Sequence, residues 1–244
     1  MTNTSRVPVV RLLVLGVLVL TATSWAQTRP PIADQIAKTY GLDSSSQIER
    51  IRYTWSADLG AVKLSRTWIW EPKTNQVSYE GKDKAGKPVK LTYLRSQVSS
   101  QPAIVKDEID PAFINDQYWL LFPFHLSWDS SAKVEETGMH KLPLGTGSAA
   151  RIVVTYPSDG GYTPGDTWEL FVGSDHRIRQ WIYHRAGTAE RTAVFTWDDY
   201  RKAGPLVVSL DHRGTYMGKP ARVFFSNVAV SLVGGSHSWV NATK

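Results

Sequence analysis

The sequence predicts a mainly β fold of the α+β class, with roughly ten to eleven antiparallel strands, an N-terminal helix and one helix in the middle of the chain. Short segments of alternating apolar and polar residues recur along most of the chain, separated by clusters of Gly, Pro, Ser and Asp. This regular spacing is typical of sandwiches and barrels. The gaps between the later segments are too short for crossover helices, so a parallel βαβ arrangement is not expected.

The first 26 residues have the pattern of a signal peptide. Arg6 and Arg11 give a basic start, residues 12–20 are almost continuously apolar, and Ser24-Trp25-Ala26 is a small-x-small cleavage site. The apolar run is shorter than the roughly 20 residues of a spanning helix, so we expect cleavage after Ala26; a retained N-terminal anchor is the alternative. Residues 27–244 are then expected to form a single domain, in the periplasm or secreted.

Composition excludes several classes of site. The chain has no cysteine, which rules out thiol catalysis, cysteine zinc sites and disulfides, so an exported domain must be held by packing alone. Lysine and arginine number 28 against 22 acidic residues, but the charges are interspersed. Nucleic-acid binding normally needs a concentrated basic face, and we therefore expect no nucleic-acid partner.

The N-terminal part of the mature chain predicts a helix followed by a long hairpin. Residues 30–40 place Ile32, Ile36 and Tyr40 at a helical spacing of four, and Gly41 is the expected C-cap. Residues 51–59 and 62–70 then alternate as two partner strands joined at Gly60. Arg66 breaks the pattern, because it shares a face with Val62, Leu64, Trp68 and Trp70, where a solvated charge is not expected.

The remaining alternating segments predict further antiparallel strands. Residues 95–110 lack a pattern and are expected to be a loop. The other expected strands are residues 76–79, 89–94, 133–140, 150–156, 166–173, 178–185, 189–197, 207–212 and 221–232.

The mid-chain stretch 110–128 is the most apolar of the mature chain. Large residues between Phe113 and Leu121 are grouped as in an amphipathic helix of two or three turns. Asp110 is the expected N-cap, Pro111 the first helical residue and Pro123 the stop. Such a helix among strands either covers the concave face of a curved sheet or is the core helix of an α+β domain.

Motifs for catalysis are absent from the sequence. There is no G-x-S-x-G, and the six histidines show no metal-ligand spacing such as H-x-x-x-H. His184 and His212 lie in strands that could be neighbours, but an imidazole on a polar strand face is the ordinary interpretation. We therefore expect no catalytic residue, no metal and no cofactor.

Tryptophan is the informative residue type. The chain has ten, and one of them, Trp25, lies in the leader. A sandwich core prefers Leu, Ile and Val, since the indole N–H needs a partner. A tryptophan-rich concave face suits a cavity for a flexible apolar ligand; a large aromatic core without a ligand is the alternative.

The order of elements resembles the periplasmic outer-membrane lipoprotein-sorting superfamily, the LolA/LolB type. The segments FINDQYWLLFPFHL, GYTPGDTWELFV, RIRQWIYHR and TWDDYRKAGPLVVSLDHRG resemble an uncharacterised exported branch of it. The resemblance implies an incomplete antiparallel β-barrel closed by helices, with an apolar cavity for acyl chains. It also implies a buried arginine near the mouth that holds the helical lid closed, and Arg66 is the candidate.

These observations lead to the hypothesis of a periplasmic, non-enzymatic carrier for a lipid, acylated protein or other apolar ligand, with residues 113–124 as a movable lid. A membrane-associated donor or acceptor protein is the expected partner, and a monomer is the default state. The alternatives are a protein-interaction or sensor module on the same fold and, third, a hydrolase. The expected ligand-binding residues are Trp55, Leu64, Arg66, Trp68, Phe113, Trp119, Phe122 and Phe124.

Overall fold

The computed structural model describes residues 29–159, 162, 164–186, 188, 190–235 and 238–244. The predicted signal peptide, residues 1–26, lies within residues 1–28, which are outside the described residues. Within the described ranges, no helix has both the length and the apolar character needed to cross a membrane.

One antiparallel sheet contains all the strands of the described part, and it is open. Its order is β4-β3-β2-β1-β12-β11-β9-β8-β7-β6-β5, with β10 paired to β11 and β13 paired to β12. The strands are β1 (Ile48–Asp58), β2 (Lys63–Glu71), β3 (Gln76–Lys82), β4 (Pro88–Leu94), β5 (Lys133–Lys141), β6 (Ser148–Thr155), β7 (Thr167–Val172), β8 (Ile178–His184), β9 (Ala193–Thr196), β10 (Asp198–Ala203), β11 (Leu206–Tyr216), β12 (Lys219–Leu232) and β13 (Val240–Asn241). Because β4 and β5 end the path unpaired with each other, the prediction of an incomplete barrel is confirmed.

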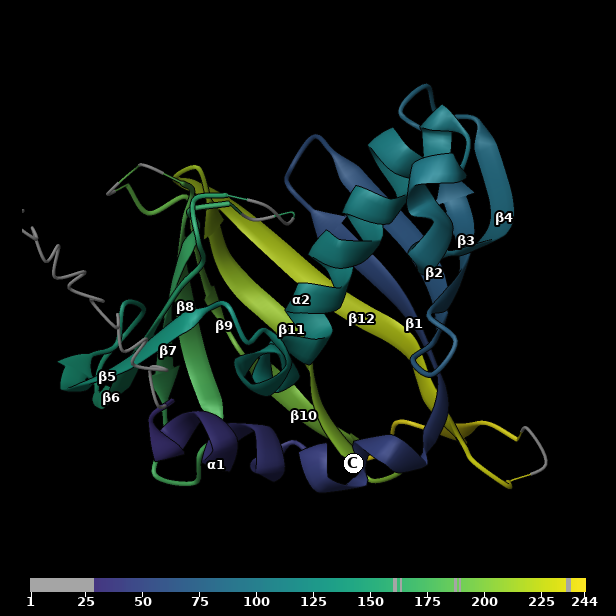
Figure 1. The fold of residues 1–244 in the computed structure, drawn as a ribbon. Coiled ribbons are helices and arrows are strands. Elements are labelled where there is room, and N and C mark those ends of the chain that lie inside the picture. The colour runs from purple at the N-terminus through teal and green to yellow at the C-terminus, as the bar shows by residue number, and fades with distance from the viewer. Residues whose placement is uncertain (1–28, 160–161, 163, 187, 189, 236–237) are drawn as a thin grey trace, which may run out of the picture.

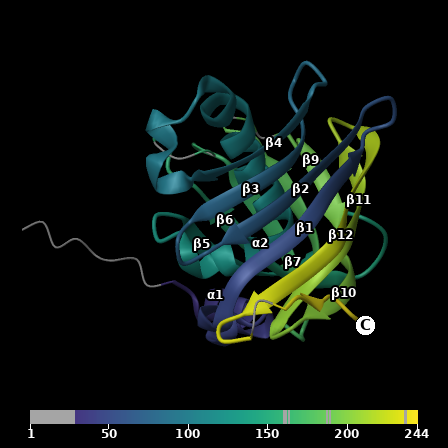
Figure 2. The same ribbon diagram turned by 90° about the vertical axis from the view of Figure 1, so that its right-hand side faces the viewer.

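The first hairpin forms as the alternation predicts. Tyr53 pairs with Trp68 and Trp55 with Arg66 across β1 and β2, so these four side chains lie on one face. On its other side β1 pairs with β12, and Figure 2 shows β2, β1 and β12 side by side. The hairpin is therefore tied into the centre of the sheet.

Two short strands, β10 and β13, were not predicted, and the strand expected over residues 189–197 is reduced to β9 (Ala193–Thr196). Residues 198–202 are Asp-Asp-Tyr-Arg-Lys and lack apolar alternation. β10 forms nevertheless because it pairs with β11 through Tyr200 and Ala203. Register with an existing strand overrides weak intrinsic preference.

The N-terminal helix α1 (Pro31–Thr39) and the following 3₁₀ turn η1 (Leu42–Gln47) confirm the prediction for this region. Gly41 joins them with φ 102°, and a Cβ there would lie 2.4 Å from the carbonyl oxygen of Pro205. Only glycine fits both the conformation and the close approach. The joint is fixed further by the Tyr40 hydroxyl, which accepts a hydrogen bond from the Ile178 amide at 2.9 Å.

The mid-chain helix α2 (Asp110–Trp128) is longer than predicted. The expected loop before it contains a 3₁₀ segment, η2 (Arg95–Ser100), and a π-turn, η3 (Val105–Ile109), which continues directly into α2. Asp110 is therefore inside a helical run and caps nothing, contrary to the prediction.

The prediction that Pro123 ends the helix is wrong as well, because Pro123 lies inside α2. Proline has no N–H for the carbonyl of Trp119, which normally disfavours this position. Burial on both sides of the proline outweighs that loss, since Phe122 and Phe124 are almost completely buried.

Helix α2 is apolar on all sides, with 14 of its 19 residues buried. A helix of this kind belongs inside a protein core. Figure 1 shows α2 crossing the concave side of the sheet, between β1–β4 on one side and β5–β9 on the other. The position expected for a covering helix is thus confirmed.

Candidate ligand-binding face and its helical cover

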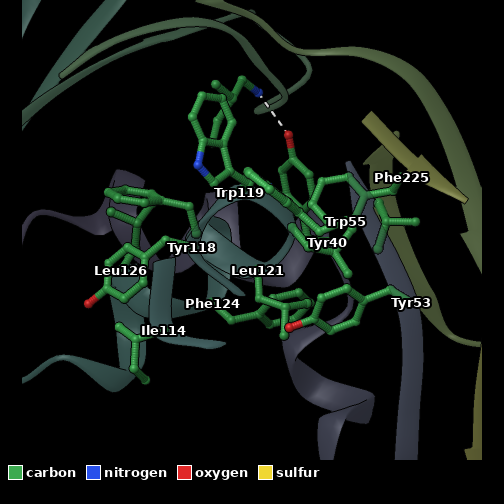
Figure 3. Packing of buried hydrophobic residues seen from close by; sticks show 14 of the residues in the cluster. Tyr40, Tyr53, Trp55, Ile114, Tyr118, Trp119, Leu121, Phe124, Leu126 and Phe225 are labelled. Carbon is green, nitrogen blue, oxygen red and sulfur yellow. Dashed lines mark hydrogen bonds between the residues drawn. The ribbon is translucent and has the colours of Figure 1, made fainter. Parts of the chain in front are cut away.

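Aromatic rings fill the interface between α2 and the concave face. The Phe113 ring lies 5.4 Å from Trp68 of β2. On the other side of the helix, Trp119 lies 4.6 Å from Trp181 of β8 and Phe122 lies 5.1 Å from Trp168 of β7. Figure 3 shows the α2 residues Tyr118, Trp119, Leu121 and Phe124 in the same cluster as Tyr53, Trp55 and Phe225 of the sheet. The helix therefore bridges both halves of the sheet through ring contacts.

The structure brings together most of the residues predicted to bind a ligand. Leu64 differs, because it lies near the turn of the first hairpin, opposite Ala57, with 39% of its surface exposed. Arg66 is partly buried beside the cluster. The six that share one buried core are Trp55, Trp68, Phe113, Trp119, Phe122 and Phe124.

Arg66 binds Asp116 of α2 in a bidentate ion pair. Its Nε and Nη2 donate to the two carboxylate oxygens at 2.7 and 2.6 Å. The Trp68 indole donates to the same carboxylate at 2.8 Å, and the Asn115 amide at 3.0 Å. The guanidinium also lies 4.2 Å over the Trp55 ring. Arg66, the residue that breaks the strand pattern, therefore binds the covering helix through two parallel hydrogen bonds and packs on Trp55 through a cation–π contact.

The Asp116 carboxylate is completely buried, whereas the Arg66 side chain is 18% exposed. Burial raises the pKa of Asp116, and the hydrogen bonds from Arg66 oppose that rise. For Arg66, burial acts to lower the pKa, but Asp116 outweighs it and the net direction is upward. Desolvation cancels much of the Coulomb gain in such a pair, so its main effect is to fix position. We call this ion pair the Arg66–Asp116 latch.

A second buried carboxylate holds the start of α2. Asp110 is completely buried and accepts hydrogen bonds from the Tyr93 hydroxyl and from Arg95 Nε, both at 2.8 Å. The Tyr162 hydroxyl donates to its other oxygen. This role as a buried acceptor could not be predicted from the sequence, because an aspartate directly before a proline predicts a helix N-cap.

A third carboxylate holds the end of the helix. Asp129 accepts from the hydroxyls of Tyr118 and Tyr156 at 2.6 and 2.8 Å, and lies 3.1 Å from His125 Nδ1. Burial acts to raise the pKa of Asp129, but hydrogen bonds from His125 and the two tyrosines outweigh burial and hold that pKa below its ordinary value. Arg29 donates to the backbone carbonyls of Leu126 and Asp129. The cover is thus attached at both ends and in the middle.

Cavities flank α2 on more than one side. A cavity of about 780 Å³ lies between the helix and the β7–β9 side of the sheet, lined by Trp119, Trp168 and Tyr183 among others. Another, of about 470 Å³, lies between η1, β1 and the last turns of the helix, with Ile48, Ile51, Leu121 and Phe124 in its mainly apolar wall. Both sizes are in the range of small-molecule sites.

The two histidines considered for chemistry have separate surroundings. His184 Nε2 lies 2.8 Å from Glu169, while His212 is completely buried and its Nδ1 lies 3.1 Å from the Thr196 carbonyl. Burial lowers the pKa of His212 to about 4. Within the part of the chain that the structure covers, no group of three His, Asp or Glu side chains is placed to hold a metal ion.

No protein-family model matches this chain, and no curated protein matches it in sequence. Three solved structures have a similar arrangement of their chains. A DUF1329 family protein from Desulfovibrio piger is 10% identical, with TM-score 0.46 over 82% of this chain and 93% of that chain. A putative outer membrane lipoprotein-sorting protein domain from Vibrio parahaemolyticus is 9% identical, with TM-score 0.47 over 82% and 91%. The lipoprotein LppX from Mycobacterium tuberculosis is 8% identical, with TM-score 0.30 over 82% and 96%.

Proposed function

We propose that this protein is a non-enzymatic carrier of the periplasm, which takes a lipid, an acylated protein or another apolar ligand onto its concave face. The observation that carries the proposal is the way α2 is attached. An apolar helix lies in an open, aromatic sheet and is joined to that sheet by the Arg66–Asp116 latch. In this proposal α2 is the lid, and the ligand inserts between it and the sheet, where both surfaces contact it.

The interface between the lid and the sheet has the chemistry that an acyl chain needs. Trp55, Trp68, Phe122 and Phe124 present rings and no charge to the interior of this interface. Each methylene moved from water into such surroundings contributes about 0.8 kcal/mol. A chain of a dozen methylenes therefore contributes about 10 kcal/mol toward opening the interface between the helix and the sheet.

The existing cavities support an entry route. The cavity of about 780 Å³ borders the lid at Trp119 and the sheet at Trp168. Its wall carries the rings of Trp119, Trp168 and Tyr183 together with polar side chains such as Asp166 and Arg185. An acyl chain entering there would reach the interface by displacing Trp119. Leu64, exposed near the turn of the hairpin, would lie outside this first contact.

The test is uptake of N-phenyl-1-naphthylamine, an uncharged fluorescent probe, together with native mass spectrometry of the secreted protein. Trp119→Asp with Phe122→Asp should abolish probe binding and any co-purified acyl-lipid mass, while the strand signal in circular dichroism is kept. Met139→Asp, on an exposed position of β5, is the control and should bind normally. Unchanged retention in the double variant would refute the carrier.

A second candidate is a protein-interaction or sensor module that keeps its core dry. The close packing of Phe113, Phe122 and Phe124, all almost completely buried, favours it. This candidate predicts that neither the native protein nor the control variant takes up the probe, and that the protein leaves the cell with a bare mass. A mass near that of residues 27–244 would also establish cleavage after Ala26.

A further inference from the structure

Buried polar atoms without hydrogen-bond partners cross the concave face beneath α2. Among the described residues, several buried indole nitrogens have no acceptor, and Nε2 of His212 and the phenol oxygen of Tyr53 also lack partners. We call these side chains the polar band: Tyr53, Trp55, Trp168, Trp181, Trp197 and His212.

Ring contacts make most of the band continuous. Trp168 lies 4.4 Å from Trp181, which lies 5.6 Å from Trp197, and Trp197 lies 5.0 Å from His212. Phe225 then joins His212 to Tyr53 at 5.9 and 5.8 Å. The band therefore runs from β7 to β1, across the middle of the sheet.

The lid does not satisfy these atoms. Trp119 lies 4.6 Å from Trp181 and 5.6 Å from His212, and Phe122 lies 5.1 Å from Trp168. Neither side chain carries a hydrogen-bond acceptor. An unpaired buried polar group is costly and rare in native proteins. Edge-on contacts such as Trp181–Trp197, at 78°, let an N–H face a ring, but that interaction is second-order.

The band also defines the charge of a suitable occupant. His212 Nδ1 donates to the Thr196 carbonyl, which leaves Nε2 as an acceptor in the neutral ring. Burial lowers the pKa of His212 to about 4, so the ring is neutral at pH 7. The nearby cation Arg66 is bound to Asp116. An anionic head group would therefore be buried without a counter-charge, which is unfavourable.

We propose that the polar band binds the uncharged polar group of an acyl ester or amide, of the monoacylglycerol type, when the lid is open. Indole N–H groups donate to the carbonyl oxygen, and His212 Nε2 accepts from a hydroxyl or amide N–H. This inference rests on the proposed carrier function and adds the class of ligand to it.

The experiment compares three competitors for bound N-phenyl-1-naphthylamine: 1-decanoylglycerol, decanoate and decane. Two new hydrogen bonds give the ester about a tenfold advantage over decane in displacing concentration. Trp181→Phe keeps a ring but loses the N–H. It should weaken the binding of decanoylglycerol about three- to tenfold and leave the binding of decane unchanged. His212→Leu should act in the same direction. Trp239→Phe, next to Arg52 at the far side of β1, is the matched control.

Each outcome decides between the two proposals. If the probe binds but decane and decanoylglycerol displace it equally, the polar band is overturned while the carrier stands. A preference for decanoate overturns the uncharged ligand. If both variants bind decane and decanoylglycerol more weakly by the same factor, with an unchanged circular dichroism spectrum, the polar band does not contact the ester and the proposal is overturned. If the probe does not bind at all, the carrier itself fails.

Discussion

Replacing Asp116 with Asn removes the negative charge of the Arg66–Asp116 latch and leaves the guanidinium opposite an uncharged amide. Breaking a buried ion pair from one side costs about 3–5 kcal/mol. Because the Arg66 side chain is 18% exposed, it can recover some hydration, and we expect the lower value of about 3 kcal/mol. If this loss falls on lid attachment, the open population rises about 100-fold.

The assay is urea unfolding followed by circular dichroism, combined with the rate of N-phenyl-1-naphthylamine uptake. Asp116→Asn should lower the free energy of unfolding and speed uptake. The double variant Arg66→Met with Asp116→Leu replaces both charges by apolar groups, which is often neutral or stabilising, so it should recover stability and slow uptake. Asp107→Asn, at an acidic position just before α2 that makes no ion pair with Arg66, is the control. A double variant as unstable as the single one would refute the reasoning.

Three further predictions concern stability. Burial lowers the pKa of His212 from 6.5 to about 4, so on acidification the unfolded chain binds the proton before the folded chain does. The free energy of unfolding should therefore be at its full value above pH 6.5 and fall by about 3 kcal/mol as the pH drops toward 4. Urea titrations of His212→Leu should not show this fall. Gly41→Ala, with φ 102° and a Cβ at 2.4 Å from the Pro205 oxygen, should cost more than about 1 kcal/mol, and an unchanged melting temperature would contradict it. Pro123→Ala restores an N–H that can donate to the carbonyl of Trp119, and relieving proline in this way is worth about 3 kcal/mol in an exposed helix. The same change removes packed methylenes, which contribute about 0.8 kcal/mol each. We expect calorimetry to show a net increase of about 1 kcal/mol in the free energy of unfolding.

The sequence was most informative where alternation and burial agree. Trp55, Trp68 and Arg66 share a face because strand periodicity is fixed at two, and a charge on that face required a partner. The partner itself, Asp116, could be suspected only from its position among large apolar residues of a helix. Periodicity places residues on faces but does not say which faces meet.

Other features depend on tertiary packing and were missed for that reason. Asp110 resembles a cap in local sequence, yet Tyr93 and Arg95 recruit it as a buried acceptor. Pro123 resembles a stop, but the helix continues because both its sides are buried. Strand β10 (Asp198–Ala203) has no pattern of its own and exists through β11. Local preference is a weak guide when the environment is supplied by distant residues.

The pairing of β1 with β12 has a consequence for how the chain acquires its fold. Residues 48–58 find their neighbours at residues 222–232, near the other end of the polypeptide. β2, β3 and β4 can assemble on β1 through adjacent hairpins, but backbone hydrogen bonds connect the two halves of the sheet only when β12 is in place. Non-local pairing of this kind slows folding. Because β12 pairs with β1 on one side and β11 on the other, it is the strand that completes the native topology.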